Sequence, residues 1–473
     1  MTTPSDLRRI PPPRPMRPMR QTAQRAANPT LQVIPLVMVI YSFLLFPVEV
    51  KLNVAGLNLY AYRIAIIAAI PLLIYLAPRR AGSLNKVDLL VALGCSWMMI
   101  SFVQLYGPNE GLVRSLAIVL DTFGGYLIAR GSISSLNDLR RVLILIIPAV
   151  GFASVFFAIE SLTGQLLVRP FFSSIFGSAV SYEGGAAQGN LNLLYETRLG
   201  LLRAYSVFSF PILGGVVLAS LLPLYLMSGL QSRALYAGAL ASAASFFSLS
   251  SAAFIALAFG IGLVVFDRFL PYLRPLRWPF VAAGLAFYGV LAEIALQGGI
   301  VGVVGRFTLN PATAYIRRMQ WKYGGETVLD NPLFGIGFAI HDKPAWLTDA
   351  IDAHFLLLAL RFGLITPVLF AIAVGIVMFT LGRNAAFLAR ADRNFVISLN
   401  IMLAILIFTS MTVTFFSEAN VFFMIALGVT TSCMIAISGT PTRRPAAQGV
   451  VRPEMQATRN VVTQAPPAGQ SGK

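Results

Sequence analysis

Two histidines and six arginines are the side chains of this sequence best suited to acid–base and anion chemistry. His341 and His354 are the only histidines of the chain, and both lie in or at the edge of a long polar segment, 297–352. An imidazole with an ordinary pKa of about 6.5 can act as a general base near neutral pH, although a histidine at the start of an interfacial helix can equally be structural. The arginines of this segment and of a second one, 163–206, are Arg169, Arg198, Arg203, Arg306, Arg317 and Arg318.

Guanidinium groups suit phosphate recognition because their planar forks donate paired hydrogen bonds. Taken singly, each of these arginines is explained as a solvated charge in a long loop. Gathered at one membrane face, they would form a cradle for a phosphate or pyrophosphate group. The run from Tyr315 to Tyr323 places Arg318 and Lys322 one helical turn apart between apolar residues, which predicts an amphipathic helix along the membrane surface. For Arg169 we expect no functional role.

Metal ions and cofactors are not expected to take part. Cys95 and Cys433 lie in separate apolar runs, far apart in the sequence, which is typical of small core side chains and not of a zinc site or disulfide framework. The segment 330–338 contains Pro332, Gly335 and Gly337 and predicts a helix end followed by a turn that depends on glycine. Because this segment lacks the Lys-Ser/Thr pair of a phosphate loop, a nucleotide fold is not supported.

Membrane helices must position these residues. Of the 473 residues 57% are apolar and only 12% are charged, with a mean hydropathy of +0.75, whereas soluble domains carry about 25% charged residues. About 20 apolar helical residues cross a bilayer. This criterion predicts an all-α polytopic membrane protein with twelve spans, which are Leu31–Pro47, Tyr60–Ala77, Asp88–Leu105, Leu112–Ala129, Val142–Leu162, Phe208–Met227, Ala234–Ser248, Ala252–Phe266, Pro279–Leu296, Ala353–Thr380, Phe395–Thr412 and Val421–Ile437.

The charge distribution predicts the topology. The net charge of +17 is concentrated in a Pro-rich basic head, in a polar tail and in alternate short connections, as expected for cytoplasmic segments that face anionic lipid, and it does not indicate nucleic acid. We therefore expect both termini to be cytoplasmic. Residues 1–30 and 439–473 are predicted to be disordered tails of a transmembrane domain that covers 31–438. Its two long outer loops, 163–206 and 297–352, contain interfacial helices in this prediction.

Five motifs follow one another in an order that resembles the O-antigen ligase and polymerase superfamily of bacterial inner-membrane glycosyltransferases. They are Arg203-Ala-Tyr-Ser206-Val-Phe208-Ser-Phe-Pro211, Ser248-Leu-Ser250-Ser251, Arg317 with Trp321, Asn331-Pro332-Leu333-Phe334-Gly335-Ile336-Gly337, and His354 with Gly363-Leu-Ile-Thr366. The resemblance covers roughly Leu201 to Thr366. It implies transfer of a glycan from an undecaprenyl-pyrophosphate carrier to another glycan or a lipid-anchored acceptor, at the outer membrane face, without a metal or cofactor.

The resemblance also implies roles for individual residues. Arg203 would face the carrier phosphates, Arg317 occupies the arginine place four residues before the tryptophan, and Arg318 beside it would share that role. His354 stands where the family carries its functional histidine, which would act as a base or orient the acceptor. The chain departs from the family at Ser251, where an arginine is common. Arg198 or Arg306 would then supply the missing phosphate contact. Asp352 lies two residues before His354. It would either orient the histidine or cap the following helix, and we expect the cap.

A transporter or flippase for a lipid-linked or anionic solute is the competing class. Such proteins hold ionisable groups near the middle of the membrane. The candidates are Asp121, Glu160 and Glu293, of which the latter two lie near predicted outer ends of spans, where exposure costs less. Only Asp121 is difficult to explain otherwise.

Overall fold

The structure is a computed structural model that describes residues 29–54, 57–76, 84–177, 195–269 and 311–438. Almost all of the predicted head, the whole predicted tail and the predicted ninth span lie outside the described residues, as does Arg306.

Helices dominate the described part of the chain. In order, the elements are α1 (Pro29–Leu45), β1 (Lys51–Val54), β2 (Leu57–Tyr60), α2 (Ala61–Leu76), α3 (Lys86–Tyr106), α4 (Pro108–Val119), the π-helical turn η1 (Leu120–Gly124), α5 (Gly125–Ser132), α6 (Leu136–Thr163), α7 (Val168–Phe176), β3 (Thr197–Arg198), β4 (Leu201–Leu202), α8 (Pro211–Met227), α9 (Ser232–Ala243), the 3₁₀ turn η3 (Ala244–Ser248), α10 (Ser251–Phe269), α13 (Pro311–Asp330), α14 (His354–Phe362), α15 (Ile365–Ala385), α16 (Arg390–Ser410) and α17 (Glu418–Ser438).

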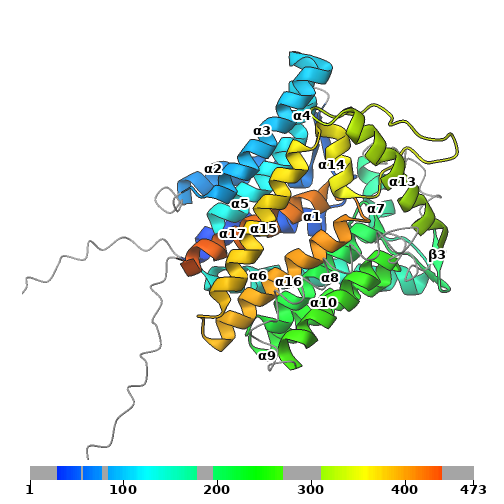
Figure 1. The fold of residues 1–473 in the computed structure, drawn as a ribbon. Helices are drawn as coiled ribbons and strands as arrows, with labels where there is room; N and C mark the ends of the chain where they lie inside the picture. Colours follow the sequence, from blue (N-terminus) through cyan, green and yellow to red (C-terminus); the bar gives the residue numbers. More distant parts are fainter. Residues whose placement is uncertain (1–28, 55–56, 77–83, 178–194, 270–310, 439–473) are drawn as a thin grey trace, which may run out of the picture. The chain divides into compact units, whose positions relative to one another are not determined.

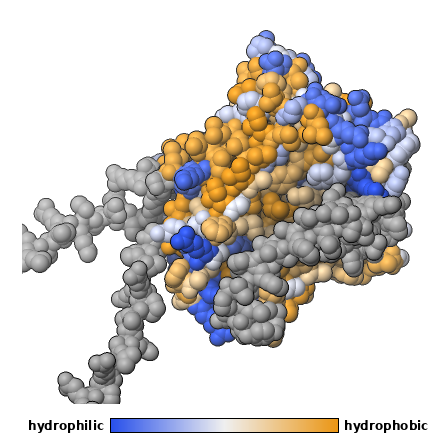
Figure 2. All heavy atoms as spheres, in the orientation of Figure 1, coloured by the Kyte–Doolittle hydropathy of each residue, from blue (hydrophilic) through white to orange (hydrophobic). Residues whose placement is uncertain are grey.

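Seven helical segments in this part of the chain are long and apolar enough to cross a membrane: α3, the continuous α4–η1–α5 segment, α6, α10, α15, α16 and α17. The shorter helices α1, α2 and α8 are also apolar. The prediction of an all-α multi-pass membrane protein is therefore confirmed, whereas the count of twelve spans is not. Figure 2 shows an apolar surface over α3 and α15 and a hydrophilic patch around α13, as expected where a helix bundle leaves the membrane.

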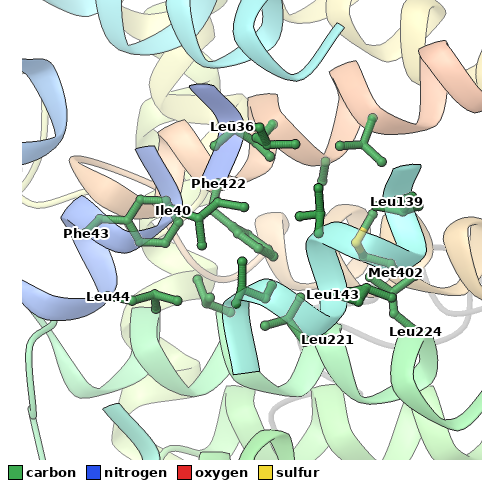
Figure 3. Close-up of a pocket in the computed structure, with 16 residues that line it drawn as sticks. Leu36, Ile40, Phe43, Leu44, Leu139, Leu143, Leu221, Leu224, Met402 and Phe422 are labelled. Atoms are coloured by element: carbon green, nitrogen blue, oxygen red, sulfur yellow. The ribbon is translucent and has the colours of Figure 1, made fainter. Parts of the chain in front are cut away.

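Side chains from distant helices meet in a large apolar core. Among the candidate spans α17 is the most enclosed, and it packs against α5, while α15 packs against α3 and α1 against α6 (Figure 1). Figure 3 shows the centre of this packing, where Leu36 of α1, Leu143 of α6 and Phe422 of α17 surround a cavity of about 40 Å³. Because its lining is wholly apolar and its volume is small, this cavity is a packing defect with no room for a substrate.

One predicted span is wrong in its extent. A single helix was expected from Ala353 to Thr380, but α14 ends at Phe362 and α15 begins at Ile365. The break is at Gly363, whose φ is +76°, and a Cβ atom there would lie only 1.9 Å from the Leu333 carbonyl oxygen. Glycine is required because no side chain fits beside this loop. The apolar span is therefore Ile365–Ala385, and His354 lies ahead of it.

Candidate anion-binding site

A short hairpin, whose strands β3 and β4 have two residues each, is followed directly by Arg203. Strands β3 and β4 are antiparallel, with Thr197 opposite Leu202 and Arg198 opposite Leu201. The Arg203 backbone N–H donates to the Glu196 carbonyl at 2.9 Å, which extends the hairpin by one bond. The guanidinium groups of Arg203 and Arg198 both pair with the Glu196 carboxylate. Two positive charges therefore converge on one negative charge.

Arg317 of α13 lies close enough to this hairpin for the charges of Arg198 and Arg203 to affect its pKa. Its side chain is buried, with 8% exposed. Burial is the main reason that the pKa of Arg317 is lowered; the charges of Arg198 and Arg203 lower it further, whereas Asp352 opposes them. We call Arg198, Arg203 and Arg317 the arginine cluster. Three guanidinium groups are thus brought together with two carboxylates, which leaves an excess of positive charge.

Two donors of the arginine cluster have no partner in the described part of the chain. The Nε atoms of Arg203 and Arg317 are buried and make no hydrogen bond to any described residue. Burial, and then the charge of Arg198, lower the pKa of Arg203. Burial alone would raise the pKa of Glu196, but the two arginines bring it below its usual range. Buried N–H donors are nearly always satisfied, so unpaired guanidinium donors in a positive environment indicate a place for an anion.

Glu160 fixes the position of the hairpin. This carboxylate is fully buried at the end of α6. One of its oxygens accepts the backbone N–H groups of Leu167 and Val168 at 3.0 and 3.1 Å, and the other accepts those of Tyr205 and Ser206 at 3.0 and 2.7 Å. The expectation that Glu160 is exposed at the end of a span is wrong. Its role is to tie α6 and α7 to the segment that carries Arg203.

Glu160→Gln is expected to lower the free energy of unfolding by about 3 kcal/mol, because its amide NH₂ would face two backbone N–H donors and leave them unpaired. Thermal unfolding of the purified protein in detergent measures this loss. Glu110→Gln is the matched control, since the Glu110 carboxylate is exposed and its one ion pair among the described residues is with Arg114, one turn away. An equal unfolding midpoint for the two variants would show that the four hydrogen bonds to the Glu160 carboxylate do not stabilise the fold.

Asp352 does not have the capping role expected of it. The residue before α14 is Ala353, and no side chain caps this helix. Instead, Gln320 of α13, which is 1% exposed, holds the segment that carries Asp352. The Gln320 Nε2 donates to the Ala350 carbonyl at 2.7 Å, and its Oε1 accepts the Asp352 N–H at 3.1 Å. Because Arg317 lies three residues before Gln320, one face of α13 positions both Arg317 and Asp352.

His354 is enclosed by aromatic rings. It is the first residue of α14 and is 4% exposed. The rings of Phe355, Phe415 and Phe423 lie 5.9, 5.2 and 5.8 Å from its own, centre to centre. Burial lowers the pKa of His354 to about 3, helped by the charge of Arg361 and opposed by a hydrogen bond to the Phe415 backbone. Its Nδ1 atom has no partner among the described residues.

The remaining predicted residues are distributed differently. Arg318 is exposed on α13 and makes no ion pair within the described ranges, so it does not join Arg317. Ser251, which replaces the expected arginine, is buried at the start of α10. His341 is buried, and the pKa of its imidazole is lowered chiefly by burial and also by the charge of Lys343. Of the two candidates offered for the missing arginine, Arg198 lies in the cluster.

The solvated-charge explanation of Arg169 is wrong. Its side chain is 4% exposed and pairs with the Glu49 carboxylate at 2.6 Å. It also donates to the Ser209 carbonyl at 3.2 Å and lies over the Tyr205 ring. Arg169 therefore stabilises the segment that follows the hairpin, through its contacts with Tyr205 and Ser209.

The glycine-containing loop has a structural role. Trp97 of α3 donates from its indole nitrogen to the Leu333 and Phe362 carbonyls, at 3.1 Å each, and its ring stacks on Phe334. The Ile336 N–H donates to the Leu360 carbonyl at 2.6 Å. These contacts close the end of α14, as expected for a turn and not for a phosphate loop.

Several important residues were not predicted from the sequence. Glu196 and Gln320 were missed, although each lies within three residues of a candidate arginine. Arg63 was also missed. It pairs with Asp121 at 2.6 Å with both side chains buried, so the ionisable group that favoured a transporter is half of an ion pair. Charge spacing along α2 and η1 offers no signal for this pair, because the partners are far apart in sequence.

Comparison with known proteins adds no family. Searches against protein-family models and against curated proteins return no match to this chain. The functional assignment therefore depends on the site itself.

Proposed function

We propose that the chain is a glycosyltransferase of the O-antigen ligase or polysaccharide polymerase type, which takes its glycan from an undecaprenyl-pyrophosphate carrier. In this proposal it acts at the outer face of the bacterial inner membrane, with both termini in the cytoplasm, and needs no metal or cofactor. The observation that supports it is the arginine cluster, with two buried Nε donors that have no partner among the described residues. A pyrophosphate held beside membrane helices is an anion that suits these donors.

The arginines would act on the leaving group. As the glycosidic bond to the pyrophosphate breaks, negative charge grows on the departing oxygen. Guanidinium groups already fixed by Glu196 and by burial would stabilise that charge more in the transition state than in the ground state. Arg203 and Arg317 are the two that combine burial with an unpaired donor, so we assign both to the pyrophosphate. Arg318, exposed on the same helix, has a lesser part.

The acceptor hydroxyl must lose a proton as it attacks the anomeric carbon. His354 is the base that the sequence suggests, but it reaches a sugar only if the phenyl rings around it move. Asp352 is half-buried beside Arg317 and needs no such movement. Parallel assays of His354→Asn and Asp352→Asn distinguish the two, because the base variant loses turnover while donor binding persists.

Deletion of the gene in its native bacterium tests the proposed function. Surface glycan is separated on a gel, and the pool of carrier-linked repeats is measured. Single repeat units on a normal anchor would identify a polymerase, and long chains retained on the carrier beside a bare anchor would identify a ligase. Unchanged glycan, or repeats trapped on the inner leaflet, would contradict the proposal and favour transport.

The burial of His354 predicts a dependence of stability on pH. Its pKa is about 3 in the folded protein and about 6.5 in an unfolded chain. The unfolded chain therefore binds the proton first as the pH falls, and stability is lost between pH 6.5 and 3. From pH 7.5 to 5 this loss amounts to about 2 kcal/mol. His354→Phe, which suits an aromatic surrounding, should lose less stability over the same interval.

Thermal midpoints of the two proteins at both pH values measure this difference. His341 is present in each, so its contribution cancels. Equal losses would mean that the imidazole of His354 is not held in the uncharged form.

A further inference from the structure

A cavity with charged side chains in its lining lies at the far end of α8 from the arginine cluster. Helix α8 begins just after the segment that carries Arg203 and ends at Met227. There the ends of α8 and α10 meet the starts of α9 and α16 around a cavity of about 470 Å³. Its lining combines charged and apolar side chains, among them Arg268, Arg390, Arg393, Asp267, Leu226 and Leu235.

Positive charge is in excess around this cavity. Asp267 is 3% exposed and pairs with Arg393 at 3.2 Å. Beside them, Asp392 pairs with Arg140 at 2.7 Å. Each carboxylate is thus matched by one guanidinium group. Two further arginines of the lining are exposed and make no ion pair within the described ranges, namely Arg268 and Arg390.

The start of α16 adds to the positive potential. This helix of 21 residues begins at Arg390, and the preceding residue, Ala389, has no side chain that could cap it. The acidic residue of its first turn, Asp392, is already paired with Arg140. Ala391 and Asn394, from its first turns, line the cavity. The first backbone N–H groups of a helix lack intrahelical partners and favour an anion. Helix start and arginines therefore point to the same kind of ligand.

We propose that this cavity binds the phosphate headgroup of an anionic phospholipid from the leaflet at this face of the protein. Arg268 and Arg390 would donate to the phosphate oxygens. Leu226 and Leu235 would contact the glycerol and the first acyl carbons, which inorganic phosphate lacks. The face is the one predicted to be cytoplasmic, where basic residues near the membrane attract anionic lipid. This site does not depend on the proposed glycan chemistry.

The purified full-length chain, freed of lipid in detergent, is titrated with phosphatidylglycerol, phosphatidylcholine and inorganic phosphate, and bound lipid is counted by native mass spectrometry. Each arginine near an anionic surface contributes about fivefold in affinity. The double variant R268Q/R390Q should therefore bind phosphatidylglycerol about 25-fold more weakly. The matched control is R383Q, because Arg383 is an exposed arginine at the end of α15 that does not line the cavity.

Three results would overturn the proposal. Unchanged lipid binding by the double variant would place the lipid elsewhere. Equal binding of phosphatidylcholine would show that headgroup charge is not recognised. Displacement of the lipid by inorganic phosphate at equal concentration would indicate a site for a free anion. Thermal midpoints without lipid should match for wild type and both variants, which separates loss of the site from misfolding.

Discussion

Arg317→Ala is expected to reduce the rate of glycan transfer about 100-fold to 1000-fold, the range found when a preorganised donor to a developing negative charge is removed. Arg317 is buried and its Nε has no partner among the described residues. Arg203→Ala should have an effect of similar size. Since the proposed function has both guanidinium groups act on one leaving group, the double variant should lose less than the product of the single losses.

Arg317→Lys keeps the charge but removes the planar fork, so a partial loss is expected. Arg318→Ala should retain most of the activity, because that side chain is exposed beside the cluster and makes no ion pair in the described chain. Transfer is measured with membranes that contain equal amounts of each variant and a carrier-linked donor. A wild-type rate of transfer in Arg317→Ala would show that the arginine cluster takes no part in the reaction. A large loss of transfer in Arg318→Ala alone would indicate that the anion binds at the exposed surface of α13.

The membrane helices were predictable because hydropathy is a local property. A run of apolar residues predicts a span wherever it lies, and α3, α6 and α16 confirm this. The break at Gly363 was not predictable, because it depends on a loop that arrives from Leu333 and leaves no space for a side chain. Residues so far apart in sequence give no periodic signal of their contact.

For the candidate site too, the sequence predicted what depends on residue type and not what depends on contacts between distant segments. Residue type alone suggested that outer arginines bind an anion, and the structure brings Arg198, Arg203 and Arg317 together. The sequence did not distinguish Arg317 from Arg318, because the orientation of α13 depends on contacts such as Gln320 with the Ala350 carbonyl. An acidic residue near the end of a span is normally explained by exposure, which is why the four-donor clamp of Glu160 was missed.

The ion pair between Arg169 and Glu49 leads to the second large effect. Arg169→Ala should lower the free energy of unfolding by about 3–5 kcal/mol, the cost of leaving a buried charge unpaired. The Glu49 side chain is 1% exposed, and its Oε2 already lacks a partner within the described residues, so no other group there can compensate. Arg114→Ala is the control, because the Arg114–Glu110 pair is exposed and such pairs contribute only about 0.3–0.5 kcal/mol.

A double replacement separates charge from packing. If the penalty comes from an unpaired carboxylate, Arg169→Met combined with Glu49→Met should recover much of the stability lost in Arg169→Ala, since apolar side chains of similar volume can replace a buried ion pair. The Ser209 carbonyl loses its Arg169 donor in both variants, so its contribution is constant across the comparison. Thermal midpoints in detergent provide the measurement. A double variant no more stable than Arg169→Ala would show that the guanidinium group stabilises this region through Ser209 and the Tyr205 ring, and not through Glu49.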